Sequence, residues 1–219
     1  WTGETDSSFS DLSGHGNDIT AVNGARNRTD GFWSYDGTND FSFRADDSDF
    51  DFGTTTDFTI QIWYNNQGGT SNDWYLISKG KISAAKGNPS TGYSLFYDAS
   101  ASELRLRIQE TTGITSPTSD HNWGASGWQN LALCVDRSTN AKFYANGELV
   151  TTDGSTSNGL NASSDRQFII GGGQNIDSAS EVLHDFNGFI GQVMIYNNKL
   201  LTQDEVRQNF NQYRGIYNV

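Results

Sequence analysis

Side chains that alternate with a period of two constrain the fold of this sequence more than any other feature. Residues 104–109 alternate apolar and polar types, and residues 58–64 place four large apolar side chains at every second position. Only a β-strand sends successive side chains to opposite faces, so both segments are predicted to be strands with one face toward a core. The predicted core-facing residues are Phe58, Ile60, Ile62, Tyr64, Leu104, Leu106 and Ile108.

Turn residues separate many further short segments of this kind. Asn146-Gly147 lies between two apolar runs and predicts a type I′ hairpin, because that turn needs positive φ at both central residues. The chain has 219 residues, with 24 glycines and 2 prolines. This length and composition predict a single domain, residues 1–219, of short strands joined by polar turns.

A helix is predicted near the C-terminus. Thr202 is an expected N-cap, and Glu205 three residues later completes a capping box. Val206, Phe210 and Tyr213 fall on one stripe, which predicts that the helix packs on a sheet through that stripe.

Segments near the two ends of the sequence carry a family resemblance. Residues 11–18 read DLSGHGND and residues 35–41 read YDGTNDF, whereas residues 188–196 read GFIGQVMIY. With the middle segments 57–63, 128–133 and 143–150, this order resembles the laminin-G-like branch of the concanavalin A-like lectins and glucanases, over nearly the whole chain. The resemblance implies an all-β jelly-roll β-sandwich of two antiparallel sheets with a short C-terminal helix.

Charge and cysteine content exclude several function classes. The net charge of −12 repels phosphate and anionic lipid, so no nucleic-acid partner is expected. No apolar run is long enough to cross a bilayer, so no membrane insertion is expected either. Cys134 is the only cysteine and lies in an apolar run, which indicates a buried small hydrophobe rather than a nucleophile.

Catalytic patterns of this superfamily are missing or incomplete. A glucanase needs paired carboxylates alternating on one strand, and no segment matches Glu-x-Asp-x-x-Glu. Residues 102–105 (SELR) and Tyr217 resemble motifs of alginate lyases, but Ala101 replaces their arginine and the Gln-x-His pair is absent. The sequence therefore predicts that the protein is not an enzyme, with a polysaccharide lyase as the third interpretation.

Glycan binding needs an aromatic surface for the sugar ring and polar groups for its hydroxyls. Trp74 and Trp123 lie in or beside loops, together with Asp120 and His121. A second candidate surface is the sheet face opposite the core, where the pattern places Trp63, Arg105 and Arg107. The two arginines are candidates for an acidic sugar. Their alternative role is pairing with neighbouring carboxylates.

Clusters of Asp and Asn in the N-terminal turns predict a structural Ca²⁺ ion, since calcium takes carboxylate and carbonyl oxygens. The candidate ligands are Asp11, Asn17, Asp36, Asn39 and Asp40. Residues 46–51 hold four further aspartates. The resemblance implies a calcium-binding acid in the strand that contains Gly191 and Gln192, but neither residue is an acid. The alternative for all these carboxylates is a local turn.

These features predict a non-catalytic, lectin-like recognition module that binds a glycan or cell-surface polysaccharide. The Asn/Gly/Ser-rich style is similar to modules of phage virions, which implies an extracellular or virion-surface location. The alternative, of a different class, is a structural virion subunit that contacts other virion subunits without binding sugar.

Overall fold

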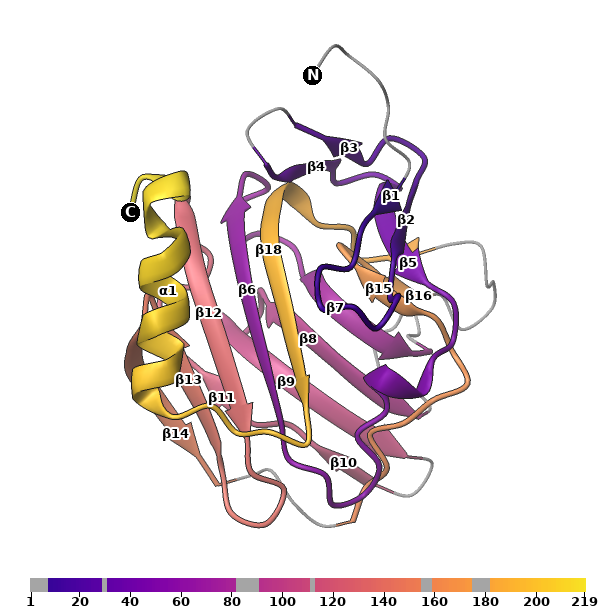
Figure 1. Ribbon diagram of the computed structural model, residues 1–219, viewed down its shortest axis with the longest axis vertical. Coiled ribbons are helices and arrows are strands. Elements are labelled where there is room, and N and C mark those ends of the chain that lie inside the picture. The colour runs from indigo at the N-terminus through magenta and orange to yellow at the C-terminus, as the bar shows by residue number, and fades with distance from the viewer. Residues whose placement is uncertain (1–7, 29–30, 82–90, 111–112, 155–158, 175–181) are drawn as a thin grey trace.

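The alternating segments form neighbouring strands of a two-sheet sandwich. The computed structural model describes residues 8–28, 31–81, 91–110, 113–154, 159–174 and 182–219. Figure 1 shows two sheets facing each other, with the C-terminal helix against the outer side of one of them. All strand pairs are antiparallel, which confirms the predicted jelly-roll sandwich.

The larger sheet has nine strands. In order they are β1 (Ser8–Phe9), β2 (Ile19–Val22), β5 (Phe41–Arg44), β15 (Phe168–Ile170), β7 (Trp74–Gly80), β8 (Gly92–Asp98), β9 (Glu103–Glu110) and β10 (Gly113–Thr115), with β11 (Thr118–Ser119) also beside β9.

The smaller sheet has seven strands. In order they are β14 (Glu148–Asp153), β13 (Ala141–Ala145), β12 (Trp128–Val135), β6 (Phe58–Asn66), β18 (Asn187–Asn197), β4 (Trp33–Asp36) and β3 (Arg26–Asn27). The remaining elements are the strand pair β16 (Gly173–Gln174) and β17 (Val182–Leu183), the short helix η1 (Ser48–Phe50) and the helix α1 (Gln203–Tyr217).

The core lies between the two sheets, as the alternation predicts. Every core-facing residue named for β6 and β9 is fully buried. On β9 this leaves Arg105, Arg107 and Gln109 on the outer face of the nine-stranded sheet. The expectation that Arg107 faces solvent is wrong, because only 9% of this residue is exposed.

The predicted hairpin and helix both form. Asn146 and Gly147 have φ values of 50° and 83° and join β13 to β14. Thr202 caps α1 through the predicted capping box with Glu205. Val206 and Phe210 are buried, so the predicted stripe docks on the seven-stranded sheet. Burying such a side chain contributes about 1.5–3 kcal/mol.

The outer edge of β18 is only partly paired, and this feature positions the candidate site. β18 pairs with β4 along Asn187–Ile190. The register of β18 against β6 on its other side shifts between Ile190 and Val193. Beyond Ile190, no described strand pairs with this edge, although the other edge continues along β6. The two sheets are therefore not closed along this stretch, and Val193 and Ile195 are only partly buried.

Candidate functional site

The tryptophans predicted for a loop site are part of the core. Trp74 is 4% exposed and stacks on Tyr97, with ring centroids 5.0 Å apart. Trp123 is fully buried, and its indole N–H donates to Ser119 Oγ at 3.1 Å. Their prediction as a sugar-binding surface is wrong for this conformation, because both rings are covered by protein.

The polar members of that loop stay near the surface. Asp120 is exposed, and His121 is half-buried with its ring 4.8 Å from that of Trp123. Burial lowers the pKa of His121 below its usual range. Without an exposed aromatic ring beside them, these two side chains offer hydrogen bonds but no apolar surface for a sugar.

The second predicted surface is divided between opposite sides of the molecule. Trp63, on β6, is fully buried under α1 and stacks on Phe210 and Tyr217 at centroid distances of 5.4 and 4.5 Å. Arg105 and Arg107 project from β9 on the outer face of the other sheet. Trp63 therefore shares no site with the two arginines.

Both arginines already have partners. Arg105 pairs with Asp98 at 3.3 Å and with Glu103 at 3.1 Å. Arg107 lies over the ring of Phe96, 4.8 Å from its centroid, and Phe96 stacks on Tyr75. For Arg105 the local ion pair is the role that the structure supports.

The residues on which the lyase interpretation depends also lie on opposite sides of the molecule. Tyr217 packs against Trp63 and Trp128 on the outer face of the seven-stranded sheet, and its hydroxyl accepts the Gln192 N–H at 2.9 Å. Arg105 lies on the outer face of the opposite sheet. A tyrosine and an arginine on opposite faces of a sandwich cannot act on one sugar unit.

The predicted calcium ligands Asp11 and Asn17 instead build a loop. The Asp11 carboxylate accepts the N–H groups of Ser13 and Asn17 at 2.8 and 3.0 Å and the Ser13 hydroxyl at 2.8 Å. The backbone hydrogen bond from Ser13 is the main cause that lowers the pKa of Asp11 to about 2. The Asn17 amide donates to Asp49 at 2.8 Å.

The second set of calcium candidates also has local partners. Asp36 accepts the Thr38 N–H at 2.8 Å, Asp40 accepts the Asp36 N–H at 3.0 Å, and the Asn39 carbonyl accepts from Asn23. No three acidic, His or Cys side chains of the described residues converge on a metal position. Calcium binding stays a prediction.

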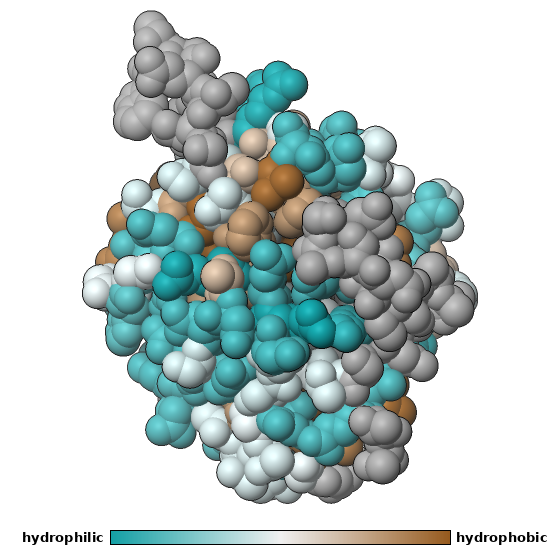
Figure 2. Space-filling view, turned by 90° about the vertical axis from the view of Figure 1, so that its right-hand side faces the viewer, coloured by the Kyte–Doolittle hydropathy of each residue, from teal (hydrophilic) through white to brown (hydrophobic). Residues whose placement is uncertain are grey.

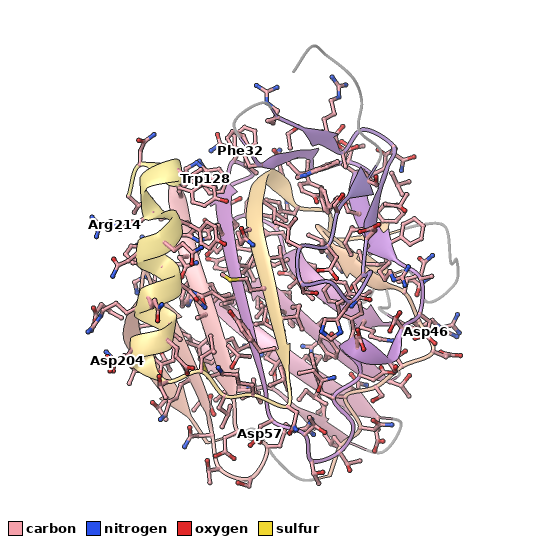
Figure 3. All side chains as sticks on the ribbon, in the orientation of Figure 1. Phe32, Asp46, Asp57, Trp128, Asp204 and Arg214 are labelled. Carbon is pink, nitrogen blue, oxygen red and sulfur yellow. The ribbon has the colours of Figure 1, made fainter. Side chains whose placement is uncertain are left out.

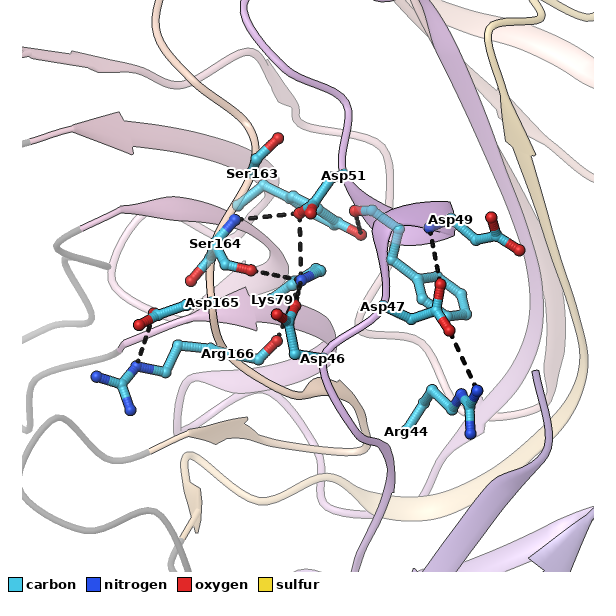
Figure 4. Close-up of polar contacts among 12 residues, drawn as sticks. Arg44, Asp46, Asp47, Asp49, Asp51, Lys79, Ser163, Ser164, Asp165 and Arg166 are labelled. Atoms are coloured by element: carbon cyan, nitrogen blue, oxygen red, sulfur yellow. Dashed lines mark hydrogen bonds and ion pairs between the residues drawn. The ribbon is translucent and has the colours of Figure 1, made fainter.

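Two of the four aspartates of residues 46–51 pair with a cation supplied by the chain. Lys79, on β7, has no exposed side-chain surface, and its amine lies 2.6 Å from Asp46 and 3.2 Å from Asp51. The backbone carbonyls of Ser164 and Arg166 accept from the same amine (Figure 4). An internal ion pair therefore uses two of the carboxylates.

Asp47 and Asp49 have structural roles in the same segment. Asp47 caps η1 by accepting the Asp49 N–H, and it pairs with Arg44 at 3.1 Å. The Asp49 carboxylate accepts the amide of Asn17 and lies 3.6 Å from His15.

The partly paired edge of β18 forms one wall of a trough with a volume of about 730 Å³. The opposite wall consists of β1 and the loop from Ser10 to Ser13, in front of the core as Figure 1 shows. The floor consists of core residues that both sheets contribute. They are Ile19, Trp33, Phe50, Phe168, Ile170 and Ile190.

Both ends of the trough are closed. At one end β4 pairs with β18 through Trp33 and Ile190. Near the other end the Asn197 amide, at the end of β18, donates to the backbone carbonyls of Asp49 and Asp51 at 3.1 and 3.4 Å. A closed trough of this volume is suited to a small ligand of a few rings, rather than to a long peptide.

The trough combines an apolar floor with a polar rim. Ser8, Ser10, Asp11, Asn17 and Gln192 surround the apolar residues. The trough can therefore hold a ring by its apolar face and bind its hydroxyls at the edge. The side of the molecule with β1, β2 and β5 is largely hydrophilic, apart from an apolar patch in its upper part (Figure 2). Among the described residues, Asp11 is the only carboxylate that lines the trough, and it is already hydrogen-bonded.

Sequence reasoning identified two trough residues, Asp11 and Asn17, but for metal binding. It missed the trough because the floor residues belong to strands far apart in the chain. The visible signal was the pair of glycine-containing blocks at the two ends of the sequence, whose segments form the opposite walls.

Half-buried aromatic residues also lie together on the outer face of the seven-stranded sheet. Phe32 lies 5.2 Å from Trp128 and 5.1 Å from Phe189, and Figure 3 shows Phe32 and Trp128 beside the end of α1. Trp128 begins β12, and its contact with Tyr217 supports a structural role.

Comparison with known families agrees with this architecture. Residues 36–207 match the Laminin_G_3 family, described as the concanavalin A-like lectin/glucanases superfamily. The chain belongs to this family. A search of curated protein sequences gives no match.

Solved structures with the same fold come from clostridial toxins. The binding domain of Paraclostridial Mosquitocidal Protein 1 superposes with a TM-score of 0.70 at 16% identity, covering 96% of this chain and 51% of that one. The binding domain of botulinum neurotoxin serotype D gives 0.67 at 14% identity, covering 93% and 48%. A structure on cell entry of botulinum neurotoxin type C gives 0.66 at 13%, with the same coverage as serotype D, and its description names an interaction with two ganglioside molecules. The chain thus spans about half the length of these toxin domains.

One departure from the family pattern has a structural reason. Where the family resemblance implies a calcium-binding acid, Gly191 leaves room for the Tyr217 hydroxyl, which a Cβ at this position would overlap. The C-terminal turn of α1 therefore packs where a side chain would otherwise project.

Among the described residues, no helix is both long and apolar enough to span a bilayer.

Proposed function

We propose that this protein is a non-catalytic recognition module that binds glycans in the trough between β18 and the N-terminal loop. The observation that carries the proposal is the trough itself, an open-topped space of about 730 Å³ with an apolar floor and a rim of hydroxyl and amide groups. Sugar recognition uses this combination, since pyranose rings have apolar faces and polar edges.

The family and the structural neighbours support a binding role. Two of the solved neighbours are described as binding domains of toxins, and a third is described through its interaction with gangliosides. Recognition of a glycan on a cell surface is the role we carry over to this chain, together with an extracellular location.

The trough residues support a non-catalytic role. A glycosidase needs a second carboxylate facing the first, at about 5–10 Å. Among the described residues that line the trough, Asp11 is the only carboxylate, and its hydrogen bonds keep it ionised, so it is not suited to act as an acid. Incubation with alginate, laminarin and xylan should release neither reducing ends nor unsaturated products.

A glycan array probed with the labelled protein tests the binding role. We expect binding to a defined group of glycans, and running the array in calcium and in EGTA also tests the predicted ion. Ser10→Trp, on the trough wall, should reduce the affinity at least about tenfold by filling the space. Thr139→Trp, in the exposed turn between β12 and β13, is the matched control and should bind as the wild type does. An array without binders, or equal loss in both variants, would contradict the proposal.

A further inference from the structure

The charge that lines the trough is negative. Among the described residues that line its walls and floor, Asp11 is the only charged one, and none is a lysine or arginine. Because the Asp11 carboxylate accepts hydrogen bonds from Ser13 and Asn17, it stays ionised at any physiological pH. A ligand carboxylate bound here would meet a fixed negative charge in a protein whose net charge is already −12.

The floor of the trough favours methyl groups. Ile19, Ile170 and Ile190 contribute aliphatic surface, and the partly buried Val193 and Ile195 continue it along β18. A hydroxyl placed against this surface would lose its water without gaining a partner, whereas a methyl group would be favourably buried.

Leu12 extends the apolar surface upward from the floor. It lines the trough and is 88% exposed, the largest exposed fraction among the described apolar residues that are exposed. Its loop is not free to fold Leu12 away, because the Asp11 N–H donates to Asp18 and Asn17 is held by Asp49. A ligand that covers this fixed leucine gains the free energy of burying its apolar surface.

From this combination we infer the ligand class of the trough, on the basis of the proposed function. The trough binds neutral sugars that carry a methyl group, as in an N-acetyl or a 6-deoxy substituent, and it disfavours uronic and other acidic sugars. The methyl group contacts the aliphatic floor and Leu12, while the ring hydroxyls contact the polar rim.

NMR titration of the ¹⁵N-labelled chain with matched methyl glycosides tests this inference. Methyl N-acetyl-β-glucosaminide is compared with methyl β-glucoside and methyl β-glucuronide, and methyl α-L-fucoside with methyl α-L-galactoside. We expect the N-acetylglucosaminide to bind about fourfold more tightly than the glucoside, or the fucoside about fourfold more tightly than the galactoside. This is the value for one buried methyl group. The glucuronide should bind most weakly, and added NaCl should narrow its disadvantage.

Leu12→Ser should reduce the preference for the methyl-bearing sugar. Leu149→Ser is the matched control, since Leu149 is 43% exposed on β14 at the far edge of the seven-stranded sheet. Preference for the glucuronide, or an unchanged methyl preference in Leu12→Ser, would overturn the inference while leaving glycan binding intact. If the array gives binders but none of these glycosides binds, the inference alone fails. If the array is also silent, both proposals fail.

Discussion

A single lysine, Lys79, supplies the positive charge beside a cluster of acidic residues. In the sequence, residues 46–51 suggest a metal loop, yet the positive charge beside Asp46 and Asp51 is an amine from β7, more than twenty residues away. A lysine without exposed side-chain surface is stable only if it is paired and hydrogen-bonded. Two carboxylates and two backbone carbonyls meet that condition here.

Removal of this amine should be strongly destabilising. Lys79→Ala leaves two carboxylates and two carbonyls without their partner, and breaking such a buried pair costs about 3–5 kcal/mol. The partial exposure of Asp46 reduces this effect, so we expect about 3 kcal/mol in urea unfolding. Lys142→Ala, at an exposed position of β13, should change the free energy of unfolding by less than about 0.5 kcal/mol. Equal values for the two variants would contradict the buried network.

Asp185 should make stability depend on pH. Burial, followed by the charges of Asp36 and Asp40, raises its pKa to about 7. In the unfolded chain the pKa is about 3.9, so between these values the folded state binds the extra proton. Its contribution to stability is therefore lost as pH rises from about 4 to 7, by up to about 4 kcal/mol.

Unfolding of Asp185→Asn against pH checks this sign. Because the amide does not ionise, the variant should gain stability relative to the wild type as pH rises through this window. Asp165→Asn, whose side chain is 81% exposed, serves as the control. A difference between Asp185→Asn and wild type that is the same at pH 5 and pH 8 would mean that Asp185 titrates normally.

At the scale of elements, α1 is the part that sequence predicts best. Its start follows from the capping box and its docking from the apolar stripe, and both depend on residues within a few turns. The partner of that stripe is less local. Trp63 alternates away from the core, and the sequence alone does not tell whether solvent, ligand or a helix covers it. The structure places α1 there, with Asn209 donating to Gln61 at 2.9 Å beside the aromatic contact.

The N-cap of α1 offers a test at this scale. Thr202→Ala removes the hydroxyl that accepts the Glu205 N–H, and such a loss costs about 1 kcal/mol. Gln208→Ala, at an exposed position of the same helix, is the control and should be nearly neutral. The free energy of unfolding in urea measures this loss for both variants. A neutral effect of Thr202→Ala would show that packing alone fixes the start of α1.

At the scale of the whole molecule, the sandwich was predictable and the trough was not. Alternation and turn residues determine strands locally, and the family-like order of segments determines their arrangement. The trough exists because β18 extends beyond its pairing with β4, and the residues that line it come from six elements, several of them distant in sequence. Tryptophans were the expected surface residues, but Trp74 and Trp123 fill the core between the sheets and Trp63 is buried under α1.

Net charge gives a prediction for the molecule as a whole. The chain carries 26 acidic and 14 basic residues, and exposed ion pairs such as Arg207–Glu148 contribute little. Unpaired acids repel one another in the folded state more than in the expanded unfolded chain. Raising NaCl from about 0.01 M to about 0.15 M shortens the screening length from about 30 Å to about 8 Å, so the Tm should rise. A Tm that falls over this range would mean that attraction within exposed ion pairs outweighs the repulsion among the remaining carboxylates, since the buried Lys79 network is screened much less.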